Sequence, residues 1–145
     1  MMLRSALATT LAAGLLLSLP AVAADAVPVR VRIIKGSRQS PAGFDPQLED
    51  VRKQLERLSY TRWDQVGLEM RDMSLGKEIE LKLPDGGSLA LTLERVQKDS
   101  VTFQVKVLAR KTQSRLTISR NQRIVHQVAD EKDGAAYFVT VRPWP

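Results

Sequence analysis

Apolar and polar residues alternate along most of this chain. Val29, Val31 and Ile33 alternate with Arg30 and Arg32, the period-2 pattern of a strand with one face in water. The alternation predicts a first strand over residues 27–35. Comparable patterns predict further strands over residues 60–66 (continuing through 68 and 70), 78–83, 89–96, 101–107, 116–118, 122–128 and 135–142.

Turn-forming residues separate these segments. Pro84-Asp85-Gly86-Gly87 combines residues that start a turn with glycines that accept positive φ, so residues 78–96 are predicted to form a hairpin. A second hairpin is predicted around Asp130-Glu131-Lys132-Asp133-Gly134, and residues 36–43 are predicted to form a loop. Because short turns join antiparallel neighbours, most strand pairs are expected to be antiparallel.

Residues 46–58 interrupt the alternation and predict one helix. Asp45 can cap its free backbone N–H groups, and Pro46 suits its first position. A helix of about three turns is not stable alone, so its apolar stripe should pack on a sheet. The predicted fold class is α+β: a single, mostly antiparallel β-sheet or a sandwich with one packed amphipathic helix. The stripe comprises Leu48, Val51, Leu55 and Leu58.

The first 24 residues have the layout of a secretory signal peptide. Arg4 is the basic residue, an uncharged and largely apolar run covers residues 6–19, and Ala21-Val22-Ala23 precedes cleavage after Ala23 or Ala24. The run is shorter than the roughly 20 residues of a membrane span. We therefore expect residues 25–145 to be a single β-rich domain, periplasmic or extracellular, and not an integral membrane protein.

The composition limits which crosslinks, metal sites and partners this chain can have. The chain has no Cys, which excludes disulfides and a lipid-bearing cysteine, and a single His, which argues against a zinc site. No cofactor or metal is predicted. The net charge is +6, which either attracts anionic partners or only keeps the domain soluble.

No catalytic residue is predicted. The single His, His126, shares a strand face with Ile124 and Val128, which favours a structural role. The acidic stretch 130–134 lacks the pattern of a Ca²⁺ loop, and no helix follows Gly86-Gly87 to receive a phosphate. Trp63 and Trp144 are predicted to pack rather than to bind a ligand.

One group of basic residues is a candidate anion patch. No acidic residue lies within this stretch, and no aromatic accompanies it, so specific nucleic-acid binding is not expected. The competing interpretation is that these charges protect an edge strand from unwanted pairing. The group comprises Arg110, Lys111, Arg115, Arg120 and Arg123.

Three short motifs carry a resemblance to a group of proteins. Val29-Arg30-Val31-Arg32-Ile33-Ile34, Phe44-Asp45-Pro46-Gln47-Leu48 and Leu83-Pro84-Asp85-Gly86-Gly87-Ser88-Leu89 stand in that order. Their layout resembles small exported Gram-negative bacterial proteins in which a strand and an Asp-Pro-opened helix precede a β-meander. The resemblance implies that fold for most of the mature chain, but it implies no activity and no functional residue.

The predicted function is a non-enzymatic binding or assembly module that docks on an envelope or extracellular protein. A first alternative is a polyanion-binding protein acting on envelope glycans or lipid head groups. A second alternative is an enzyme inhibitor, or an enzyme whose site the sequence does not reveal.

Overall fold

The computed structural model describes residues 26–143. The predicted signal peptide, residues 1–24, and Trp144 lie outside the described residues, and what was predicted for them stays a prediction. No helix within residues 26–143 combines the length and the apolar character that crossing a membrane requires.

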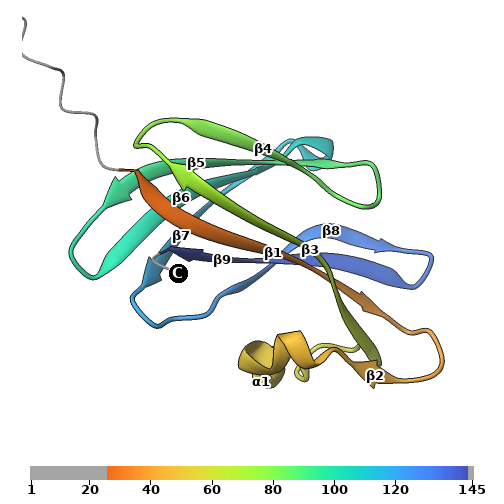
Figure 1. The fold of residues 1–145 in the computed structure, drawn as a ribbon. Helices are drawn as coiled ribbons and strands as arrows, with labels where there is room; N and C mark the ends of the chain where they lie inside the picture. The colour runs from red at the N-terminus through yellow and green to blue at the C-terminus, as the bar shows by residue number, and fades with distance from the viewer. Residues whose placement is uncertain (1–25, 144–145) are drawn as a thin grey trace, which may run out of the picture.

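Strands dominate the described part of the chain, with one short α-helix and two 3₁₀ segments (Figure 1). The elements in chain order are β1 (Val27–Ser37), β2 (Gly43–Phe44), η1 (Pro46–Val51), α1 (Arg52–Leu55), β3 (Arg62–Met73), β4 (Glu78–Lys82), β5 (Ser88–Val96), β6 (Ser100–Val107), η2 (Leu108–Arg110), β7 (Thr112–Ser119), β8 (Val125–Lys132) and β9 (Ala135–Pro143).

These strands form two sheets. The five-stranded sheet has the order β2-β3-β1-β9-β8, and the four-stranded sheet has the order β4-β5-β6-β7. Every pair is antiparallel except β2 with β3, which is parallel. The prediction of mostly antiparallel pairing is confirmed. Of the two predicted arrangements, the single sheet is wrong, because the hairpin β4–β5 and its neighbours pair among themselves and not with β1.

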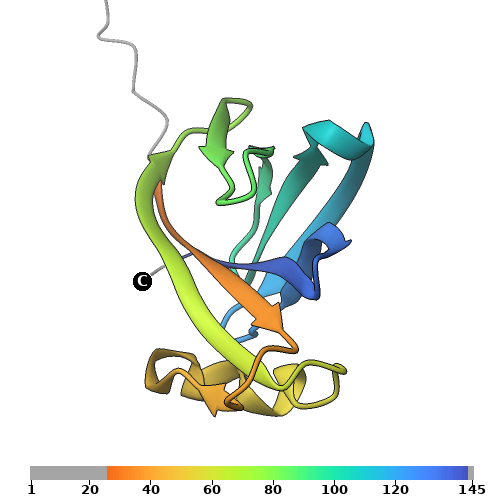
Figure 2. The same ribbon diagram turned by 90° about the vertical axis from the view of Figure 1, so that its right-hand side faces the viewer.

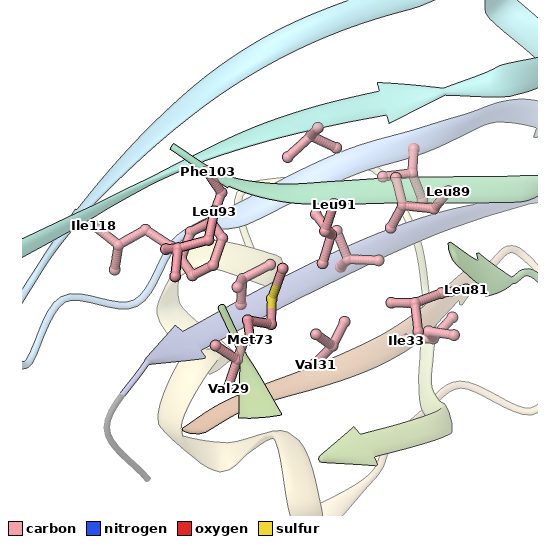
Figure 3. Packing of buried hydrophobic residues seen from close by; sticks show 14 of the residues in the cluster. Val29, Val31, Ile33, Met73, Leu81, Leu89, Leu91, Leu93, Phe103 and Ile118 are labelled. Atoms are coloured by element: carbon pink, nitrogen blue, oxygen red, sulfur yellow. The ribbon is translucent and has the colours of Figure 1, made fainter. Parts of the chain in front are cut away.

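The main core lies between the two sheets (Figure 3). Val29, Val31 and Ile33 of β1 face Leu91 and Leu93 of β5 across it, and all five side chains are buried. The alternation of β1 thus gives the five-stranded sheet an inner, core-facing side and an outer side, on which Arg30 and Arg32 lie. The same core takes in Phe103, Ile118 and Met73.

A second, smaller core lies on the outer face of the five-stranded sheet, under the helical segment η1–α1. Trp63 contacts Phe138 with ring centroids 5.4 Å apart, and Tyr60 meets Trp63 edge-on at 5.6 Å. A Cβ on Gly36 would come within 2.7 Å of the Trp63 ring, so only glycine allows this close approach. The prediction that Trp63 packs is confirmed. The helical residues in this core are Leu48, Val51 and Leu55.

The helical segment differs from the predicted helix in form and length. Its first six residues form a 3₁₀ helix, only four residues are α-helical, and Leu58 lies beyond the end and is 38% exposed. Three of the four predicted stripe residues are therefore buried. Asp45 caps as predicted, since its carboxylate accepts from the Gln47 N–H at 3.0 Å, and it also accepts from the Gln65 N–H of β3 at 3.0 Å.

Both predicted hairpins are present. The turn after β4 closes with the Gly86 N–H donating to the Leu83 carbonyl at 3.0 Å, and Gly86 has φ +87°. Between β8 and β9, Asp133 and Gly134 both have positive φ, as in a type I′ turn. The acidic stretch 130–134 is thus explained as strand and turn.

We predict that Leu55→Ala lowers the free energy of unfolding by about 2–5 kcal/mol, because it leaves a cavity beneath the helical segment. Leu58→Ala is the matched control and should cost less than about 0.5 kcal/mol, the usual range for exposed sites. Urea unfolding of both variants measures the difference. Equal losses would contradict the packing described above.

Candidate binding surface

The five predicted basic residues are spread over the molecule. Arg110 ends η2 and Arg120 follows β7, so the eight residues of β7, about 26 Å of strand, separate them. Arg110 pairs with Asp130, Arg115 pairs with Glu94 at 2.7 Å, and Arg123 pairs with Asp50 at 3.3 Å. The five residues, Lys111 included, therefore do not form one patch; only Arg120 and Arg123 line the same small cavity.

Edge protection remains the other interpretation of these charges. β7 is an outermost strand of the four-stranded sheet, and Arg115 lies on it. A charged residue on an outer strand opposes pairing with other chains.

His126 lies opposite Val139 of β9, whose side chain belongs to the main core. Burial lowers the pKa of His126, and the positive charge of Arg110 lowers it further, so the imidazole is neutral at pH 7. Among residues 26–143, no group of three His, Cys, Asp or Glu side chains could hold a metal ion.

A hollow of about 500 Å³ lies on the outer face of the four-stranded sheet. Four of its six polar side chains bond to one another: Arg115 to Glu94 at 2.7 Å, and the Thr102 hydroxyl to the Thr117 hydroxyl at 3.1 Å. Arg95 and Thr92 complete the polar lining, so only these two side chains remain for a ligand to bind.

The outer face of the five-stranded sheet is partly covered, because the helical segment η1–α1 packs on only one half of it. The second core contains Ile34, Trp63 and Phe138, which lie at one end of β1, β3 and β9 (Figure 2). At the other end the outer face carries Arg30, Leu68, Met70 and Arg142, which we call the open half.

Arg32 lies at the border between the covered and the open half. Its guanidinium binds both carboxylate oxygens of Asp50, at 2.8 and 2.7 Å, and its Nε donates to the Thr140 hydroxyl at 3.0 Å. Arg123 shares the same carboxylate. Burial alone would raise the pKa of Asp50, but the hydrogen bonds and the charge of Arg32, together with the hydrogen bond from Arg123, bring that pKa below its ordinary value.

In the part of the chain that the structure describes, Arg30 and Arg142 have no such partner. They lie directly opposite each other on β1 and β9, where like charges repel. Arg30 Nε is buried and has no hydrogen-bond partner among residues 26–143. Within residues 26–143, no carboxylate forms an ion pair with either guanidinium. The open half therefore carries two positive charges that no carboxylate of residues 26–143 neutralises.

Beside these arginines, β3 exposes an apolar stripe. Leu68 and Met70 lie opposite Arg32 and Arg30, so they share the outer face with them, and they are 46% and 63% exposed. Val66, at the bulge of the strand, is 41% exposed. In the described chain, β2 pairs with β3 only at Arg62 and Trp63, so the rest of this edge of β3 has no strand beside it (Figure 2).

The sequence indicated part of this surface. The alternation of residues 29–33 placed Arg30 and Arg32 on one face, but nothing in the sequence paired that strand with residues 135–143. No family model, curated protein or solved structure matched this chain in the comparisons. The surface is therefore interpreted from its own geometry.

We predict that Asp50→Asn lowers stability at pH 7 by about 1–2 kcal/mol, since it leaves the buried Arg32 without a carboxylate while solvent screens part of the loss. The pKa of Asp50 is lowered in the folded state, so its contribution is present above the unfolded value of about 3.9 and disappears as pH falls through the folded value. The difference between wild type and variant should therefore vanish in acid.

Thermal unfolding from pH 7 to pH 2 measures this difference. Asp130→Asn is the control, because the Asp130 side chain is 85% exposed and should change stability little at any pH. The role given to the Asp50 carboxylate would be contradicted if wild type and Asp50→Asn differed in stability as much at pH 2 as at pH 7.

Proposed function

We propose that this chain is an exported, non-enzymatic binding module of the α+β class that adds an extended, acidic segment of a partner protein to the free edge of β3. The observation that carries the proposal is that, within residues 26–143, this edge has no neighbouring strand beyond Trp63, while the outer face of β3 exposes Val66, Leu68 and Met70. An extended segment that adds to such an edge gains backbone hydrogen bonds, and its alternate side chains gain apolar contacts.

The other face of the same strand restricts which segment can add. Glu69 and Arg71 lie opposite the core residues Val31 and Val29, and they pair with each other at 3.1 Å. Charges that point inward on an edge strand discourage indiscriminate pairing. A segment that adds here has to accommodate both charges, which favours a specific partner over aggregation.

Charge complementarity supports an acidic segment. Arg30 lies beside Met70 on the outer face, Arg142 lies one strand further, and neither has a carboxylate partner in the described chain. The net charge of +6 would draw an acidic partner toward this surface and orient it. The predicted signal peptide would bring the module to the envelope or the extracellular space, where the partner is expected.

Site-specific photo-crosslinking tests the proposal. A benzophenone amino acid in place of Met70 should form an adduct with an envelope or extracellular protein through an acidic, extended segment of that protein. The same group in place of Leu108, which is 47% exposed beyond the four-stranded sheet, is the matched control and should not form this adduct. In the purified adduct, amide hydrogen exchange of residues 68–72 should slow relative to the free protein.

A charge reversal completes the test. Arg30→Glu places a carboxylate opposite Arg142, so the fold should survive while the yield of adduct falls by about tenfold or more. Arg95→Glu, on the other sheet, should leave the yield unchanged. Adducts with only a second copy of this chain, equal adducts from position 108, or unchanged exchange at residues 68–72 would each overturn the proposal.

A further inference from the structure

The two predicted hairpin turns lie at the same end of the molecule (Figure 1). Two adjoining hollows, of about 410 and 290 Å³, border these turns, and both are lined by Asp85, Asp130 and Lys132. Sites for small ligands commonly have a volume of about 300–1,000 Å³. The larger hollow is therefore of the right size for a small molecule.

Part of the wall of the larger hollow is the end of the main core. Leu83, Val107 and Val128 line it, and all three belong to the cluster between the two sheets. Leu83 follows β4, Val107 ends β6 and Val128 lies on β8, so both sheets contribute to this wall. An apolar group that enters the hollow here would leave water and contact apolar side chains, which is favourable.

Some of the charged residues around the hollows are already paired. Arg110 pairs with Asp130, and Glu131 pairs with Arg38 at 2.8 Å. Four others form no ion pair with any residue in the range 26–143, although they line the same hollows. The four are Lys35, Asp85, Lys132 and Asp133. Two positive and two negative groups are thus left for a ligand.

Asp85 and Lys132 carry the two unpaired charges that line both hollows. The turn holds the Asp85 carboxylate in place, because its Oδ1 accepts from the Gly87 N–H at 2.9 Å, while its Oδ2 has no donor in the described chain. A carboxylate that is already oriented loses little freedom when it binds a cation. Lys132, the last residue of β8, offers three N–H donors to an anion.

From this arrangement we infer that the larger hollow binds a small apolar zwitterion, namely an α-amino acid with an apolar side chain. The side chain contacts Leu83, Val107 and Val128. The α-ammonium group donates to Oδ2 of Asp85, and the α-carboxylate accepts from Lys132. An apolar wall with a few polar groups that fix the orientation of the ligand is the usual composition of such a site.

This inference is independent of the proposed function. The described residues that line the two hollows include none from β3, whereas the proposed partner segment adds to the free edge of β3. Substitutions at positions 85 and 132 should leave crosslinking from position 70 intact, so the two proposals fail separately.

Calorimetric titration of the mature protein with L-leucine and L-phenylalanine tests the inference. We expect saturable binding of at least one of them. The N-acetyl derivative of the amino acid that binds lacks the cation, and its amide lacks the carboxylate. Each derivative should bind about tenfold more weakly, as expected for losing a hydrogen bond between charged groups. Glycine, which lacks the apolar side chain, should also bind more weakly.

Two substitutions test the role given to each charge. Lys132→Gln should weaken binding of the amino acid about tenfold but not binding of its amide, which has no carboxylate to lose. Asp85→Asn keeps an oxygen for the Gly87 N–H and should weaken binding of the amino acid about tenfold but not that of its N-acetyl derivative. Lys98→Gln is the matched control and should bind like wild type, since it lies between β5 and β6 at the opposite end of the four-stranded sheet.

Nuclear magnetic resonance locates the site, and unfolding curves show whether each variant is folded. The amide resonances of Gly87 and Val128 should shift when the amino acid is added, whereas those of Leu68 and Met70 should not. The inference fails if neither amino acid binds saturably, or if both derivatives or glycine bind as tightly as the amino acid. It also fails if the folded variants at positions 85 and 132 bind like wild type, or if the resonances of Gly87 and Val128 do not shift.

Discussion

The limited length of the helical segment determines which surfaces of this protein are exposed. The ten residues of η1 and α1 span about 15–20 Å, whereas the eleven residues of β1 extend about 36 Å. The segment therefore covers one half of the outer face of the five-stranded sheet and leaves the other half open. Arg32 lies between the two halves, and its guanidinium binds Asp50 on the helical segment and Thr140 on β9.

Arg30 and Arg32 show how the same pattern leads to different environments. They stand two positions apart on one strand and point to the same side of the sheet. Arg32 reaches the carboxylate of Asp50 in η1, and Arg32 is only 7% exposed. Arg30 lies beyond that segment and faces Arg142 instead. Arg32 links the helical segment to the five-stranded sheet, and Arg30 contributes to the surface to which we assign binding.

Local features of the fold could be predicted from the sequence because period-2 alternation, turn residues and the Asp-Pro start are all encoded within a few positions. The hairpin β4–β5, the hairpin β8–β9 and the buried Leu48, Val51 and Leu55 were predicted in this way. β7 proved longer than the 116–118 strand, since its first residues are polar and show no apolar alternation.

Features that depend on distant pairing could not be predicted from the sequence. The contact between β1 and β9, which sets Arg142 beside Arg30, joins the two ends of the described chain. The separation of Arg110 from Arg120 follows from the extended form of β7, whereas the sequence shows only that both lie within a short stretch. Charge density along a sequence is therefore a poor guide to charge density on a surface when the residues occupy strands.

The central position of β1 also has a consequence for the order of assembly. Its two neighbours are β3 and β9, and Val29 pairs with Pro143 at the far end of the described chain. The five-stranded sheet can close only after the last strand is available, and such distant contacts form late because they close a very long loop. The strands of the four-stranded sheet follow one another in the chain, so that sheet can form before the five-stranded sheet closes.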